Sequence, residues 1–204
     1  MKKLWKQIIC FAITAAALGG AIGAHASLPL GVNVLVNPGF EDATIAPWSA
    51  EGGGASVSIS SVAQTGLQSA QVDFTADFHG VSQTISLLGN DRLATYTLTC
   101  SVNTDGYTDP FIVRLGLWEK SGSWTFNTGD WVAVPAGSSG WVDLSYTVTL
   151  TDAAASQLRV VVQCAPQGTP KLAGHFLVDD VSLIKTPLQL NRWVSSGSGR
   201  SPMV

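Results

Sequence analysis

Short segments with strand-like alternation recur along this chain, and they constrain its fold more than any other feature. After Ser27, runs of four to ten alternating apolar and polar residues are separated by turns rich in Gly, Pro, Asn and Asp. Side chains of a strand alternate between two faces, and no segment here has the period of an amphipathic helix. Many short strands without helices predict an all-β fold, an antiparallel β-sandwich of the jelly-roll type. The strands are expected at residues 32–36, 55–60, 69–74, 80–87, 94–102, 111–119, 131–134, 141–150, 157–164 and 175–183.

The two ends of the chain depart from this pattern. Residues 1–26 combine a basic start, an apolar stretch and a closing AHA motif, which is the layout of a secretory signal peptide. Cleavage is expected near Ala26-Ser27, so we expect the protein to be secreted, periplasmic or on the cell surface. Residues 187–204 contain a Ser- and Gly-rich stretch and are expected to form a flexible tail. One β-sandwich module is therefore predicted over residues 27–186.

The charge distribution excludes several classes of partner. Removal of the signal peptide would leave 8 Lys and Arg against 14 Asp and Glu, and the basic residues are dispersed. Nucleic acids and anionic membranes attract clustered basic residues, so we expect neither as a partner. No later run is long and apolar enough to span a bilayer. A monomer that does not associate with membranes is expected.

Two cysteines remain after the signal peptide, Cys100 and Cys164, and both share the strand phase of their apolar neighbours. In an exported protein such a pair can form a disulfide, which we predict here. The alternative is two buried thiols that never meet, because pairing cannot be deduced from spacing.

The last expected strand contains two adjacent carboxylates in FLVDDVSLI, residues 176–184. Asp179 falls on the phase of Leu177 and Val181, where an ionised carboxylate is costly unless something pairs with it. Near the first strand, VNPGFED supplies Glu41, and terminal jelly-roll strands often lie side by side. Glu41 and Asp179 could converge on calcium, which takes carboxylate and carbonyl oxygens, here from the QTGLQS turn. Alternatively, Asp179 or Asp180 accepts backbone hydrogen bonds at a strand bend.

Five stretches occur in a fixed order over residues 33–184: VNPGFED with PWSA, SVAQTGLQSAQV, GVSQTISLLGNDRLATYTLTCSVNTDG, VPAGSSGWVDLSYTVTL and FLVDDVSLI. In content and order they resemble the CenC-type carbohydrate-binding modules of families four, nine and twenty-two, which are galactose-binding-like jelly rolls. The resemblance implies a structural calcium held by Glu41 and Asp179. It also implies that sugar binds in a cleft on the concave sheet, lined by aromatic and polar side chains.

Candidate sugar-binding residues follow from that implied cleft and from strand phase. The core phase of FIVRLGLWE leaves Arg114 and Trp118 on the opposite face, and the core phase of QLRVVVQC leaves Arg159 and Gln163 there. Sugar rings pack on aromatic faces, while their hydroxyls need hydrogen-bonding groups. We predict stacking and hydrogen bonding by five residues: Trp118, Trp124, Trp131, Arg114 and Gln163. For each Trp the alternative is ordinary packing at a sheet edge.

Two aromatic residues of the implied cleft are absent, because Ser101 and Val161 stand where related modules often carry aromatics. Trp48 and Trp141 match positions that are typically part of the scaffold. A glycosidase needs two carboxylates flanking the scissile bond, and the acids here lie mostly in turns. The strand acids Glu119 and Asp143 have no evident partner. No hydrolase or zinc motif is present in the sequence, so we expect no enzyme.

The sequence therefore predicts a non-catalytic, secreted module that binds polysaccharide or oligosaccharide, of the β-glucan or xylan class, and carries one structural calcium. Two alternatives remain. One is an exported structural or adhesive cell-surface protein with the same fold, and the other is an accessory fragment of a glycoside hydrolase.

Overall fold

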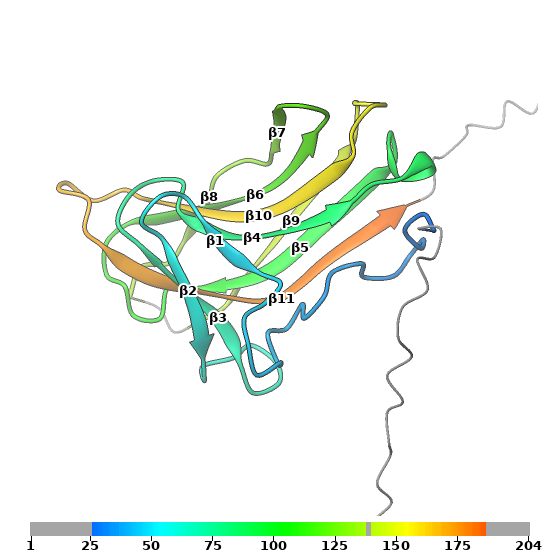
Figure 1. The fold of residues 1–204 in the computed structure, drawn as a ribbon. Helices are drawn as coiled ribbons and strands as arrows, with labels where there is room; N and C mark the ends of the chain where they lie inside the picture. The colour runs from blue at the N-terminus through cyan, green and yellow to red at the C-terminus, as the bar shows by residue number, and fades with distance from the viewer. Residues whose placement is uncertain (1–25, 138–139, 187–204) are drawn as a thin grey trace, which may run out of the picture.

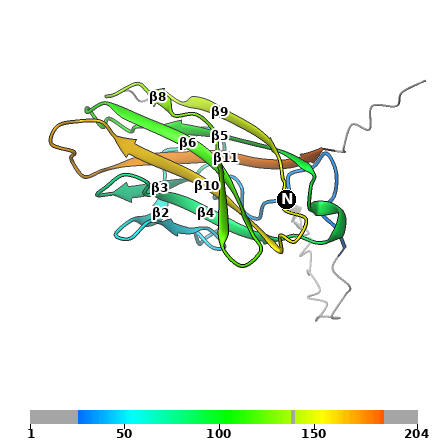
Figure 2. The same ribbon diagram turned by 90° about the horizontal axis from the view of Figure 1, so that it is seen from above.

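The computed structural model describes residues 26–137 and 140–186, and these form two antiparallel sheets packed face to face (Figures 1 and 2). The predicted signal peptide and tail lie outside the described residues, apart from Ala26. The six-stranded sheet has the order β1-β4-β10-β6-β7, with β8 also pairing with β6. Its strands are β1 (Ser49–Glu51), β4 (Gly80–Ser86), β10 (Gln157–Pro166), β6 (Phe111–Lys120), β7 (Trp124–Thr128) and β8 (Val132–Val134).

The five-stranded sheet has the order β2-β3-β11-β5-β9. Its strands are β2 (Ser56–Ser60), β3 (Ser69–Phe74), β11 (Gly174–Thr186), β5 (Thr95–Asn103) and β9 (Val142–Thr149). A short 3-10 turn, η1 (Gly89–Asp91), connects β4 to β5. The predicted antiparallel β-sandwich is thus confirmed.

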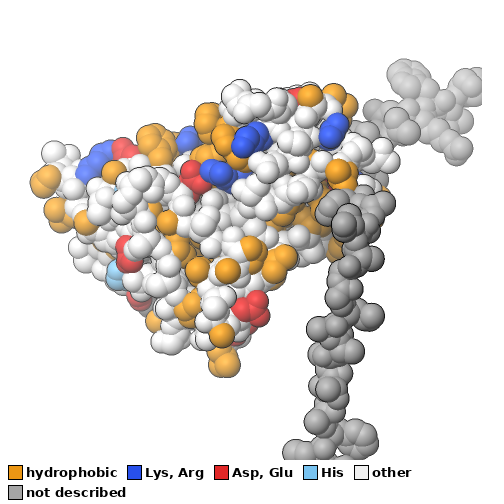
Figure 3. All heavy atoms as spheres, viewed as in Figure 1, with side chains coloured by type: hydrophobic (Ala, Val, Ile, Leu, Met, Phe, Trp, Pro, Cys, Tyr) orange, Lys and Arg blue, Asp and Glu red, His pale blue; other side chains and the backbone are white. Residues whose placement is uncertain are grey.

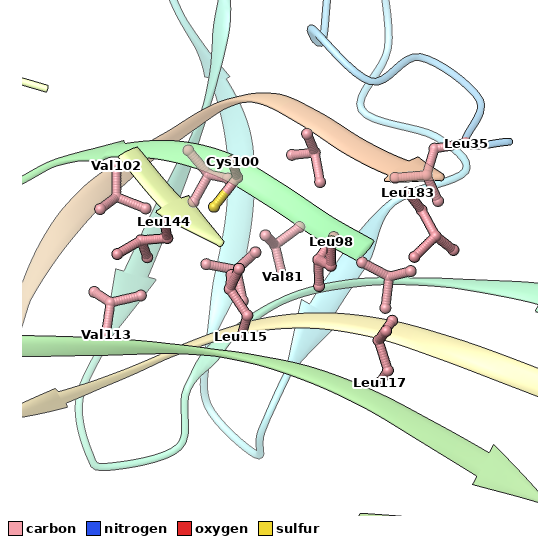
Figure 4. Packing of buried hydrophobic residues seen from close by; sticks show 14 of the residues in the cluster. Leu35, Val81, Leu98, Cys100, Val102, Val113, Leu115, Leu117, Leu144 and Leu183 are labelled. Atoms are coloured by element: carbon pink, nitrogen blue, oxygen red, sulfur yellow. The ribbon is translucent and has the colours of Figure 1, made fainter. Parts of the chain in front are cut away.

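The core lies between the two sheets. Leu98, Cys100 and Val102 of β5 face Val113 and Leu115 of β6 across it, as Figure 4 shows. All of these side chains are buried, because alternate positions of each strand point inward.

The predicted strand at residues 32–36 is the one expected strand that does not form as such. This segment instead lies along β11 through isolated bridges, Leu30 to Lys185 and Asn33 to Ile184. Two strands were not expected: β1 is only three residues long, and β7 continues the hairpin after β6. The N-terminal segment and the last strand are therefore neighbours, as the calcium prediction requires.

The predicted disulfide is wrong in this structure, because Cys100 and Cys164 are both free and buried. Cys100 belongs to β5 of one sheet, whereas Cys164 belongs to β10 of the other. Strand phase fixes that both side chains point inward, but it does not fix which inward side chains meet. Burial raises the pKa of both thiols well above the usual range, so neither forms a reactive thiolate readily.

The predicted phase of Asp179 also needs correction. The pairing of β11 with β5 shifts between Asp179 and Ser182, and Asp180 has a positive φ of 50°. This β-bulge reverses the alternation, so Val178 and Val181 both face the core. Asp179 pairs with Ser101 on the opposite face of the sheet. It is nevertheless fully buried, because the loop at residues 64–65 covers it.

Candidate functional site

The six-stranded sheet has one face turned away from the core, which we call the outer face. Figure 1 shows β4, β6 and β10 bending together towards this side, so that the outer face is concave. Strand register places polar and aromatic side chains in cross-strand rows on it. The outer-face residues of these strands include Ser82 and Thr84 of β4, Arg159, Val161 and Gln163 of β10, Arg114, Gly116, Trp118 and Lys120 of β6, and Trp124, Phe126 and Thr128 of the edge strand β7.

One cluster of aromatic and basic side chains forms where β6 meets β7. The Trp118 and Phe126 rings pack edge to face with centroids 4.7 Å apart. The Arg159 guanidinium lies 4.4 Å from the centroid of Trp124, and the Lys120 ammonium lies 5.3 Å from the same ring. Arg159 also donates to Glu51 Oε2 at 3.1 Å. Cation–π contacts of this kind hold the Trp124 ring at a defined angle on the surface.

A second cluster lies towards the other end of β6. The Arg114 guanidinium is 4.5 Å from the Trp131 ring and 5.3 Å from the Phe78 ring. It donates to Gln163 Oε1 from two nitrogens at 3.2 and 3.4 Å, and the Gln163 amide in turn donates to the Phe78 carbonyl. Partial burial lowers the pKa of Arg114, yet an arginine stays protonated because its ordinary value is so high.

Between the two clusters runs a row of small side chains, which we call the central row. Ser82, Val161, Gly116 and Thr128 lie opposite one another across β4, β10, β6 and β7. A Cβ added at Gly116 would lie 2.8 Å from Nε1 of Trp118, so the indole N–H is directly beside this row. That buried Nε1 has no hydrogen-bond partner among the described residues. Ser82, Val161 and Gly116 are themselves buried, so the central row is a strip of small side chains packed between the two clusters, with the buried indole N–H at its edge.

All five predicted sugar-binding residues lie in or beside the outer face. The structure brings Trp118 and Trp124 together in the first cluster, and Arg114, Trp131 and Gln163 together in the second. Trp118 is only 7% exposed and its Nε1 is buried, so it supports the Phe126 ring more than it offers a surface of its own.

Two exposed phenylalanine rings lie on or beside the outer face, although neither was predicted as a sugar-binding residue. Phe126 is 62% exposed and Phe78 is 50% exposed. Phe78 was missed because it sits in the loop before β4, where strand phase gives no direction; its φ is 63°. The two positions where related modules often carry an aromatic residue lie on different sheets: Val161 is on the outer face, and Ser101 is on the five-stranded sheet.

The predicted calcium ligands Glu41 and Asp179 approach the same loop. Asp179 accepts hydrogen bonds from the amides of Gln64 and Thr65 at 2.8 and 3.2 Å, and from its neighbour Asp180 at 2.7 Å. Glu41 Oε1 accepts from the amides of Leu67 and Gln68 at 2.8 and 2.9 Å. Desolvation raises the pKa of Asp179, while those backbone hydrogen bonds act in the opposite direction.

This donor set offers carboxylate oxygens, which are ligands that calcium takes, while the loop at residues 64–68 directs backbone N–H groups at the same oxygens. Oε2 of Glu41 accepts no hydrogen bond from the described residues. A Cβ added at Gly39 would lie 3.9 Å from both Oδ1 of Asp179 and Cγ of Glu41, so the two side chains flank one space. Within residues 26–137 and 140–186, however, no group of three or more His, Cys, Asp and Glu could hold a metal. Any ion here would depend on backbone carbonyls.

Glu119 and Asp143, for which the sequence showed no partner, form hydrogen bonds within the fold. Glu119 is fully buried and accepts from the Asn127 amide and from the backbone of Thr151 and Asp152. Asp143 accepts from the Ser101 hydroxyl at 2.6 Å on the other sheet. The two carboxylates are thus engaged at different places, which is not the arrangement of a glycosidase pair.

Comparisons with known proteins agree with this geometry. The profile of a family described as "Carbohydrate binding domain" matches residues 32–169. The chain belongs to this carbohydrate-binding domain family. A search of curated proteins finds no match.

Solved structures show the same fold. A xylan-binding domain of carbohydrate-binding family 22 superposes with a TM-score of 0.60 at 22% identity, covering 78% of this chain and 97% of that domain. The CBM22-1 xylan-binding domain from Paenibacillus barcinonensis gives 0.55 at 17% identity, covering 72% and 91%. A family 61 module in complex with β-1,4-galactotriose gives 0.51 at 20% identity, covering 75% and 98%. These superpositions show that this carbohydrate-binding domain shares its fold with the three modules.

Proposed function

We propose that this carbohydrate-binding domain is a non-catalytic, exported module that binds polysaccharide along the outer face. A single observation carries the proposal: two clusters of aromatic and basic side chains flank the central row of small residues on one concave face. Exposed rings of Phe78 and Phe126 lie on either side of this row.

The chemistry of this face suits a sugar chain. Pyranose rings present C–H faces that pack on aromatic rings, and Trp124, Trp131, Phe78 and Phe126 supply such rings. Hydroxyl groups need donors and acceptors, and the partly buried Arg114 guanidinium and Thr128 hydroxyl provide them on this face. Binding to a polymer would raise the local concentration of whatever is attached to the module.

Xylan and β-glucan are the polysaccharides we propose first, and two of the structural neighbours are described as xylan-binding domains. A calcium ion between Glu41 and Asp179 belongs to the same proposal. When bound, it would supply positive charge that offsets burial of the Asp179 carboxylate, which supports the loop at residues 64–68. Export rests on the signal-peptide pattern of residues 1–26. No helix among the described residues is long and apolar enough to cross a membrane.

Affinity electrophoresis in gels that contain xylan, β-glucan, mannan or galactan tests the proposal. We expect at least one polysaccharide to retard the wild-type protein, and Trp124→Ala to migrate faster than wild type in that gel. Leu67→Ala is the matched control, because Leu67 is 78% exposed in a loop of the other sheet. If no polysaccharide retards the wild type, glycan binding is wrong and the structural or adhesive alternative gains support. Equal retardation of Trp124→Ala would remove the outer face from the binding site.

A further inference from the structure

We propose that the glycan bound by the outer face is acidic, and that Arg114 binds the carboxylate of a uronic acid unit. This inference rests on the proposed function, since it names the substrate class of the same site. It is carried by the distribution of charge on the molecule and by the guanidinium of Arg114, which no acid compensates within the described residues.

Basic residues are scarce in this domain, yet they concentrate on one face. Residues 27–186 contain 6 Lys and Arg against 14 Asp and Glu. Three of the six, Arg114, Lys120 and Arg159, project from the outer face. Figure 3 shows blue side chains over the upper part of the molecule, where β4, β6 and β10 run. Within the part of the chain that the structure describes, Glu51 is the only acid at an outer-face strand position. An otherwise acidic domain thus presents a positive face, which attracts anionic ligands.

Arg114 stands apart from most of the other basic residues because its charge is not neutralised. Arg159, Lys171 and Lys185 pair with Glu51, Asp77 and Asp91 respectively. Arg114 forms no ion pair within the described residues, and its side-chain partner is the neutral amide of Gln163.

The surroundings of Arg114 hold it in place. The Trp131 and Phe78 rings contact its guanidinium, which therefore is oriented without being compensated. A guanidinium held in this way suits two-point binding of a carboxylate.

Lys120 adds a second uncompensated cation to this face. Among the described residues it forms no ion pair and lies over the Trp124 ring. The outer-face cation Arg159, in contrast, is paired with Glu51. A hydroxyl both donates and accepts, whereas an ionised carboxylate only accepts and carries negative charge. A surface with uncompensated cations therefore complements a carboxylate better than it complements hydroxyl groups alone.

A cavity of about 400 Å³ opens beside Arg114, between β7 and β9. Thr128, Gly129 and Tyr146 line it, and so does Asp130. A carboxylate inside this cavity would meet the like charge of Asp130. We therefore assign the uronic acid group to the outer-face side of Arg114, above the central row, and not to the cavity.

Paired ligands test this assignment with the purified protein. Glucuronoxylan and polygalacturonate are each used as such and after chemical reduction of their carboxylates to alcohols, which leaves the backbone unchanged. We expect the wild type to bind at least one acid polymer about tenfold more tightly than its reduced form at low salt, equivalent to about 1.4 kcal/mol. The preference should shrink as salt is added.

Two variants locate the effect. Arg114→Gln should remove most of the preference for the acid form. Arg92→Gln should keep it, because this variant removes the same charge at the η1 turn, outside the outer face. Thermal melts of both variants confirm that each is folded.

The outcomes separate this inference from the proposed function. Equal binding of acid and reduced polymers, or an unchanged preference in Arg114→Gln, overturns the uronic acid assignment and leaves glycan binding intact. Competition by dextran sulfate at equal charge would show that the face binds any polyanion, which also overturns the assignment. If neither these polymers nor the neutral panel bind, the proposed function itself is wrong.

Discussion

Replacement of Glu119 by Gln is expected to destabilise the domain although the two side chains have nearly the same shape. Glu119 is fully buried at the end of β6. Its carboxylate accepts from Asn127 Nδ2 at 2.8 Å, from the Thr151 amide at 3.2 Å and from the Asp152 amide at 2.9 Å. All three partners are donors, so each of its oxygens acts as an acceptor.

The magnitude follows from this geometry. Gln replaces one oxygen with an NH₂ group, which would face an N–H and leave at least one buried donor without an acceptor. An unsatisfied buried group costs about 1–3 kcal/mol, so we expect a loss of about 2 kcal/mol. For a domain of this size that corresponds to a fall in Tm of about 4–8 °C.

Thermal unfolding followed by circular dichroism measures this loss. Asp42→Asn makes the same chemical change at an exposed carboxylate and should stay within about 0.5 kcal/mol of wild type. Because Asn127 belongs to β7, Glu119→Gln should also weaken glycan binding by loosening the hairpin with Trp124 and Phe126. A Glu119→Gln protein that melts with the wild type would refute the reasoning.

Three further predictions concern the thiols, the central row and the loop at residues 64–68. In the domain spanning residues 27–186, titration with a thiol reagent should find no reactive cysteine in the folded protein and two after denaturation; a result of none after denaturation would indicate a disulfide. Gly116→Val should displace the Trp118 indole beside the central row, which weakens polysaccharide retardation in gels and costs about 1–3 kcal/mol in a urea melt; unchanged binding would exclude the central row from the binding site. Calcium at a hundredfold excess over its Kd should stabilise the wild type by about 2.7 kcal/mol relative to chelator, and Asp179→Asn should lose this shift. Identical wild-type melts in calcium and chelator would remove the metal from the proposal.

Much of the fold followed from the sequence because period-two alternation is a direct signature of strands. The same alternation located the outer face, since Arg114 and Trp118 on β6 and Gln163 on β10 oppose the core phase of their strands. Sequence alone could not give the pairing of strands from distant segments. The two cysteines therefore could be placed inside the sandwich but not paired or separated.

The carboxylates show where strand alternation predicts the direction of a side chain correctly and where it fails. Asp179 was expected to face the core, but the bulge at Asp180 moved it to the opposite face of β11. A bulge adds one residue to a strand, and a pair of adjacent aspartates does not predict where a bulge occurs. Glu119, in contrast, does share the core phase of Leu115 and Leu117, so alternation alone could have identified it as a buried carboxylate. What the sequence could not supply was its partners, which come from β7 and the loop after β9.

The central claim is that glycan binds on the outer face, and the indole N–H resonances of the tryptophans test it most directly. Oligosaccharides of xylan, β-glucan and galactan are titrated into the ¹⁵N-labelled protein. We predict that at least one shifts the indole signals of Trp118, Trp124 and Trp131. The Trp48 signal should stay fixed, because its Nε1 is buried and bonded to the carbonyls of Val36 and Asn37. Shifts confined to Trp48, or no shift at any of the three outer-face indoles with any ligand, would contradict the claim.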